Sequence, residues 1–156
     1  MKQDWSIFTG LLCRTWLADM ILPSKQLLSE VLGKEVIKIA FAKTGDRGQS
    51  LSNNNIEISI YPYHTVYFNI YELMHMMKEW AVVRNQECKN IDGKEQFYIN
   101  DICSQFIGFS HIWQCIVGYR NITEEYNSDE KKCFTSETET EAVFQACEWI
   151  LNEITN

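Results

Sequence analysis

The strongest constraint on the fold is an amphipathic helix predicted over residues 138–154, TETEAVFQACEWILNEI. Its apolar residues recur every three or four positions, which places them on one helical face: Val143, Ala146, Cys147, Ile150, Leu151 and Ile154. Two capping boxes are available at its start, Ser136 with Glu139 or Thr138 with Glu141. A helix with one apolar face needs another layer to cover that face.

A second core-facing helix is predicted after Asn69, which can cap it together with Glu72. Its apolar stripe follows helical spacing: Ile70, Leu73, Met74, Met77, Trp80 and Ala81. The spacing from Glu72 to Glu79-Trp80 recurs from Glu141 to Glu148-Trp149. We therefore consider two explanations, chance and a strand-strand-helix unit used twice.

Short apolar segments on either side of the second helix predict antiparallel strands. Residues 34–42 alternate Val36, Lys38 and Ala40 against Ile37, Ile39 and Phe41, and the 56–61 strand is followed by a turn at Pro62-Tyr63 and a strand at 64–68. Further strands are predicted at 95–101, 104–109 and 111–119. The polar segment 44–55 and the charged run 121–132 are predicted as solvated loops, the latter before a short strand at Cys133-Phe134.

This order of elements predicts an α+β fold in which helices pack on an antiparallel sheet. Pro23-Ser24 marks a boundary, so we expect a single domain over residues 23–156, with a short helix at 25–33 ending at Gly33. Residues 1–22 are expected to be a helical extension, in which Trp5 and Trp16 recur at helical spacing.

Charge and cysteine content exclude several classes of function. The net charge of -7 repels phosphate backbones, so direct nucleic-acid binding is not expected. The six cysteines show no CxxC spacing and no signal peptide is apparent, so we expect reduced thiols in the cytoplasm and no zinc site. The apolar run from Trp5 to Leu22 contains Arg14 and Asp19, which argues against a membrane span.

No motif predicts catalysis, a metal ion or a cofactor, so we expect no enzymatic activity. The histidines are His64, His75 and His111, and none lies in the His-x-Ser/Thr pattern of two-histidine phosphoesterases. Residues 45–48, GDRG, have the spacing of the backbone-clamping loop of KH domains. Because Asp46 would repel phosphate and a strand follows, a connection between strands is the favoured interpretation.

At NIYELMHMMKEWA, residues 69–81, and TETEAVFQACEWIL, residues 138–151, the chain resembles small uncharacterised proteins of bacteriophages and prophages. The last helix is also similar to phage ABA-sandwich domains. The resemblance extends over residues 27–154 and implies an ABA-sandwich-like α+β fold. It also implies a non-enzymatic counter-defence inhibitor, anti-CRISPR-like, that binds a host immune effector in the host cytoplasm.

Two mechanisms for such an inhibitor remain open. Acidic residues can occupy a nucleic-acid-binding surface of the effector by charge mimicry: Glu124, Glu125, Asp129 and Glu130. Alternatively, the chain forms an oligomeric sponge that sequesters a nucleotide signal in a pocket made by basic and aromatic residues: Lys43, Arg47, Tyr61, Tyr63 and His64.

Two further alternatives belong to other functional classes. A nucleotide-degrading hydrolase would depend on His64 or His111. A phage structural or assembly accessory would use Trp5 and Trp16 as a protein-binding surface and form homo-oligomers. The partner is therefore expected to be a host protein, a nucleotide signal or another copy of the chain, and no membrane is implied.

Overall fold

The computed structural model describes residues 22–41, 55–86, 95–123 and 127–155. Its elements are α2 (Lys25–Leu32), β1 (Val36–Phe41), β2 (Asn55–Ile60), β3 (His64–Asn69), α3 (Ile70–Gln86), β4 (Glu95–Ile107), β5 (Ile112–Thr123), β6 (Asn127–Ser136) and α4 (Glu139–Thr155). The predicted N-terminal helix and most of the predicted 44–55 loop lie outside the described residues.

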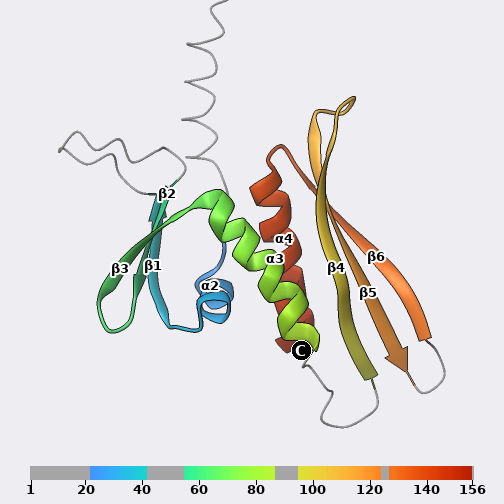
Figure 1. Cartoon of the computed structure of the whole chain (residues 1–156), viewed down its shortest axis with the longest axis horizontal. Coiled ribbons are helices and arrows are strands. Elements are labelled where there is room, and N and C mark those ends of the chain that lie inside the picture. The colour runs from blue at the N-terminus through green and yellow to red at the C-terminus, as the bar shows by residue number, and fades with distance from the viewer. Residues whose placement is uncertain (1–21, 42–54, 87–94, 124–126, 156) are drawn as a thin grey trace, which may run out of the picture.

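The described strands form two antiparallel sheets, in the orders β1-β2-β3 and β4-β5-β6. Helices α2, α3 and α4 lie between them, so the layers are sheet, helices, sheet (Figure 1). We call the face of each sheet toward the helices its inner face. The predicted α+β class, with helices packed on antiparallel strands, is confirmed.

One buried apolar cluster joins both sheets to the three helices. The inner face of β2 contributes Ile56, Ile58 and Ile60, and the predicted stripes of α3 and α4 are buried, with Ile154 partly buried. On β5, Cys115 and Val117 are buried, while Trp113 and Tyr119 pack against the cluster. Burying each large aliphatic side chain contributes roughly 1.5–3 kcal/mol before entropy is counted. The periodicity therefore identified the buried faces of α3, α4 and β2 correctly.

Helix α2 begins and ends where its sequence predicts. The Ser24 hydroxyl accepts a hydrogen bond from the Leu27 N–H at 3.1 Å, and Gly33 closes the helix with φ 64°. Glycine adopts this left-handed conformation without the penalty that a Cβ imposes. The Ser24 N–H also donates to Glu148 Oε1 at 2.6 Å, which ties the start of α2 to α4.

The structure shows which residues cap the N-termini of α3 and α4. Asn69 Oδ1 accepts from the Tyr71 N–H at 2.9 Å, which makes it the N-cap of α3. At α4, Thr138 Oγ1 accepts from the Glu141 N–H at 3.3 Å, and the first helical residue is Glu139. Of the two N-caps open from the sequence, Thr138 is therefore the one in place, whereas Ser136 is still in β6 and accepts from the Thr138 N–H at 3.5 Å.

The predicted alternation in residues 34–42 is wrong at its start. The register between β1 and β2 shifts between Val36 and Lys38, which makes Ile37 an extra residue in a β-bulge. Val36 is buried and Ile37 is exposed, whereas Ile39 and Phe41 pack against the core. The bulge thus lets Val36 on one side of it, and Ile39 and Phe41 on the other, all face the helices.

The predicted strands 95–101 and 104–109 are one strand, β4, which runs from Glu95 to Ile107. Its register with β5 shifts between Ile99 and Asp101. Asn100 is the extra residue, so Ile99 and Ile102 both pack against the core although they are three positions apart. A bulge interrupts the sequence alternation without ending the strand, which is why the prediction divided it.

The predicted solvated loop at 121–132 is wrong for its described part. Strand β5 continues to Thr123, and β6 begins at Asn127, well before the expected strand at Cys133-Phe134. Antiparallel edge strands tolerate charged residues because their outward side chains stay in water. Charge therefore did not mark a loop here.

The order of elements agrees with the hypothesis of a repeated unit, with three strands in each unit instead of two. The orders β1-β2-β3-α3 and β4-β5-β6-α4 are the same, and α3 and α4 each contain 17 residues. Trp80 and Trp149 occupy the same position within their helices.

Candidate functional site

The structure separates the histidines. His64 begins β3, directly after the β2–β3 turn, and His111 lies in the β4–β5 turn. These two turns are at opposite ends of the molecule (Figure 1). His75 is on the exposed side of α3. Among the described residues, no group of three His, Cys, Asp or Glu side chains could hold a metal ion. The geometry therefore offers no support for the hydrolase alternative.

One polar cluster joins α3, β4 and α4. Lys78 Nζ donates to Ser104 Oγ at 2.6 Å, and the Ser104 hydroxyl donates to the Glu139 carboxylate. Lys78 Nζ also lies 3.7 Å from Glu139 Oε1. The arrangement therefore links α3, β4 and α4 through one polar cluster.

Burial also suppresses thiol chemistry in the core. Burial raises the pKa of Cys115 to about 12, against a smaller lowering by the Lys78 ammonium. Burial likewise raises the pKa of the Cys147 thiol. Because the thiolate is the nucleophilic form, burial disfavours nucleophilic chemistry of both thiols near neutral pH. Cys103 of β4 and Cys133 of β6 are free, exposed thiols. Both are opposite Ile116, so they lie on the face of the sheet away from Cys115.

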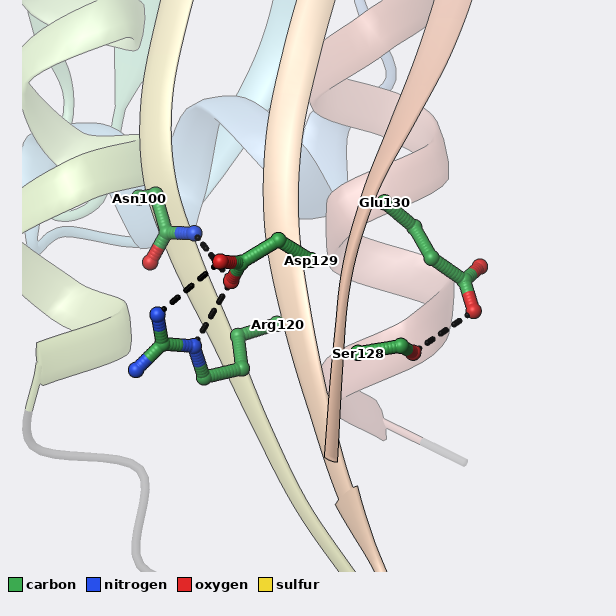
Figure 2. Close-up of polar contacts among 5 residues, drawn as sticks. All are labelled: Asn100, Arg120, Ser128, Asp129 and Glu130. Atoms are coloured by element: carbon green, nitrogen blue, oxygen red, sulfur yellow. Dashed lines mark hydrogen bonds and ion pairs between the residues drawn. The ribbon is translucent and has the colours of Figure 1, made fainter. Parts of the chain in front are cut away.

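Asp129, one of the acidic residues predicted to act by charge mimicry, forms an ion pair with Arg120 of the neighbouring strand. Arg120 Nε lies 2.7 Å from Asp129 Oδ1 and Arg120 Nη2 lies 3.0 Å from Oδ2, so the contact has two parallel hydrogen bonds (Figure 2). Asn100, the bulged residue of β4, donates to the same carboxylate at 3.5 Å. The hydrogen bonds from Arg120 hold the pKa of Asp129 below its usual range. The Asp129 charge is thus compensated locally.

The next acidic residue, Glu130, has different partners. It accepts from the Tyr119 hydroxyl at 2.6 Å and from the Ser128 hydroxyl at 2.9 Å. The hydrogen bond from Tyr119 lowers the pKa of Glu130 and raises the pKa of Tyr119 to about 12. Successive strand residues face opposite sides, so Asp129 and Glu130 do not form one acidic surface. Glu124 and Glu125 lie outside the described residues.

The predicted ligand-binding aromatics lie in the β2–β3 turn. Tyr61, Tyr63 and His64 are exposed, and the two tyrosine rings are 6.4 Å apart at 48°. Tyr63 has φ 94° and is 87% exposed. The turn therefore brings these aromatics together at the surface. Lys43 and Arg47, the predicted basic part of the pocket, lie outside the described residues, as do Trp5 and Trp16.

The sequence reasoning missed a second aromatic group, at the β4–β5 turn. We call it the aromatic tip and define it as Phe106, Phe109, His111 and Trp113. Phe109 is 92% exposed and Phe106 is 52% exposed. The Phe106 ring centroid lies 5.3 Å from that of Trp113 and 6.5 Å from that of His111. The signal that could have found it is the segment 102–119, which contains no Asp, Glu, Lys or Arg in a chain that is 22% charged.

No family model matches the chain, and neither a curated protein nor a solved structure is detectably similar to it. Among the described residues, no helix is both long and apolar enough to cross a membrane. The functional interpretation therefore depends on the geometry of the surface described above.

Proposed function

We propose that this chain is a non-enzymatic binding protein whose aromatic tip contacts an apolar pocket of another protein. The observation that carries the proposal is the exposure of Phe109 and Phe106 at an uncharged hairpin end. Aromatic anchors that enter a partner's pocket supply much of the binding energy of protein interfaces. The polar groups with catalytic potential, Ser104 and Lys78, are used in contacts between elements.

The charge of the chain favours a protein as the partner. A net charge of -7 repels both phosphate backbones and anionic lipid surfaces. The tip itself contains no formally charged side chain, so an apolar pocket could accept it without desolvating an ion.

The resemblance to phage proteins makes the proposal more specific. The partner would be a host immune effector in the bacterial cytoplasm, and the chain a counter-defence inhibitor of the anti-CRISPR type. Because Asp129 and Glu130 are engaged within their own sheet, insertion of the aromatic tip is a better supported contact than charge mimicry by these two residues.

Sequestration of a nucleotide is the second candidate. The exposed, neighbouring rings of Tyr61 and Tyr63 favour it, because aromatic faces can stack on a nucleobase. Incubation with nucleotide extracts, removal of free nucleotide, denaturation and mass spectrometry would release an intact ligand if this function is correct.

The proposed contact is tested by replacing Phe109 with a photo-crosslinking amino acid in host cells, with a matched replacement of Tyr63 in the opposite turn. We expect a crosslinked partner from position 109 only. With that partner purified, Phe109→Ser should raise Kd by about 30-fold, the effect of losing about 2 kcal/mol from an anchor. Tyr63→Ser, which also removes an exposed ring, should leave Kd unchanged. Equal Kd for wild type and Phe109→Ser would contradict the proposal.

A further inference from the structure

The outward edge of β3 differs from the other strand edges in the described part of the chain. Strand β3 is last in the order β1-β2-β3, so it pairs with β2 on one side only. Figure 1 shows it at the outer side of its sheet. Its residues His64, Thr65 and Tyr67 are exposed, whereas Val66 and Phe68 are half-buried. We call this edge, residues His64–Asn69, the β3 edge.

Exposed edges usually carry features that prevent pairing with another strand, such as charges, prolines and bulges. The other three edge strands in the described residues have them: β1 has a bulge at Ile37 and a charge at Lys38, β4 has a bulge at Asn100, and β6 has consecutive charges from Asp129 to Lys132.

The β3 edge has none of these features. Its sequence, HTVYFN, contains no Asp, Glu, Lys, Arg or Pro, and its register with β2 is unbroken from His64 to Asn69. Its central residues, Thr65 to Phe68, are of the β-branched and aromatic types that pair well across strands. The chemistry of this edge therefore fits an added strand, because backbone donors and acceptors recognise extended backbone.

We propose that the β3 edge is a self-association surface, on which β3 of a second copy pairs antiparallel to give a continuous six-stranded sheet. In a symmetric antiparallel pair, opposed side chains lie on the same face, so a residue at the two-fold axis faces itself. Either Val66 or Tyr67 can take that place.

Both registers are compatible with the side chains. With Tyr67 on the axis, its ring opposes the partner's Tyr67 on the outer face, and Val66 opposes the partner's Phe68 on the inner face. With Val66 on the axis, Thr65 opposes the partner's Tyr67. No formal charge opposes another in either register, so the strand is complementary to itself. This fit favours a second copy over a foreign strand as the occupant.

The total charge gives the association a distinctive dependence on salt. Two copies that each carry -7 repel one another, whereas the paired strands carry no formal charge. Screening should therefore strengthen the dimer as ionic strength rises, the reverse of an interface held by ion pairs.

Sedimentation of the full chain should show a shift from monomer to dimer between about 5 and about 500 µM, since a short edge pairing gives weak association. The dimer fraction should increase in high salt. Hydrogen exchange measured at both concentrations should show slower exchange of the 64–69 amides at the higher concentration, and unchanged exchange at 127–136. This comparison needs no variant, so it does not depend on whether a substitution folds.

The matched variants place lysines on two edges. Thr65→Lys/Tyr67→Lys adds two charges to exposed positions of β3 and should abolish the dimer. The control, Cys133→Lys/Thr135→Lys, adds two charges to exposed positions of edge strand β6 with the same spacing and should leave the dimer intact.

A monomer at every concentration overturns the proposal, as does a dimer whose protection lies outside 64–69. Protection of 64–69 that appears only when a different protein is added to monomeric chain would assign the edge to a foreign strand and also overturn it. The inference does not rest on the aromatic tip: Phe109→Ser should leave this dimer unchanged, so failure of the two proposals is distinguishable.

Discussion

Replacing Lys78 tests whether the polar cluster of Lys78, Ser104 and Glu139 stabilises the fold. Lys78→Met keeps most of the aliphatic stem and removes the ammonium group. The change loses the 2.6 Å hydrogen bond from Lys78 to Ser104 and the 3.7 Å ion pair with Glu139. The Ser104 hydroxyl can still donate to Glu139, so the carboxylate keeps one partner.

The expected magnitude follows from these contacts. A hydrogen bond to a charged group contributes about 1.5–3 kcal/mol net, and an ion pair that retains some contact with water adds about 0.2–1 kcal/mol. The Lys78 and Glu139 side chains are 19% and 24% exposed, so both contributions are reduced by solvent. Glu139 also stays favourable in the first turn of α4. We therefore expect Lys78→Met to lower the free energy of unfolding by about 2 kcal/mol.

Urea denaturation followed by tryptophan fluorescence measures this change as a lower midpoint at an unchanged slope. Lys131→Met, at an exposed position of β6, removes the same charge and should shift the free energy of unfolding by less than about 0.5 kcal/mol. A double-mutant cycle with Glu139→Gln should give a coupling of at least about 0.5 kcal/mol. If Lys78→Met matched Lys131→Met, the stabilising role assigned to the cluster would be refuted.

Three further predictions address the core and the sheet. Ile58→Ala, at a fully buried position of β2, should lower the free energy of unfolding, measured in urea, by about 2–5 kcal/mol, and a loss below about 1 kcal/mol would contradict a tightly packed core at this position. The Cys115 pKa is raised from 9.0 to about 12, so above pH 9 the unfolded state alone releases this proton and stability should fall between about pH 9 and 12. Between pH 8 and pH 10, the free energy of unfolding should fall less in Cys115→Ala than in wild type, as urea denaturation at both pH values would show. An equal fall in both proteins would contradict the raised pKa of Cys115. Finally, Arg120→Gln should raise the pKa of the Asp129 carboxyl in an NMR titration, because Arg120 is the main cause of its lowering; an unchanged pKa would show that the pair does not persist in solution.

The features that the sequence alone determined are local ones. The stripes of α3 and α4, the boundary at Pro23-Ser24, the Asn69 cap, the Gly33 helix end and the buried face of β2 all follow from residues within about four positions of one another. At that range, helical and strand geometry fixes which side chains share a face. The same information predicted the α+β class and the β2–β3 turn.

The tertiary structure decided the features that depend on pairing between distant segments. The bulges at Ile37 and Asn100 exist because β1 and β4 must keep apolar residues of both parities on their inner faces, which only the register with β2 and β5 reveals. The ion pair between Asp129 and Arg120 joins β6 to β5. The negative charge of Asp129 is therefore paired with a cation that only the strand register brings close. The exposure of Phe109 likewise depends on tertiary structure. A hydrophobic side chain favours burial, but only the packing of the other elements decides whether the β4–β5 turn is covered.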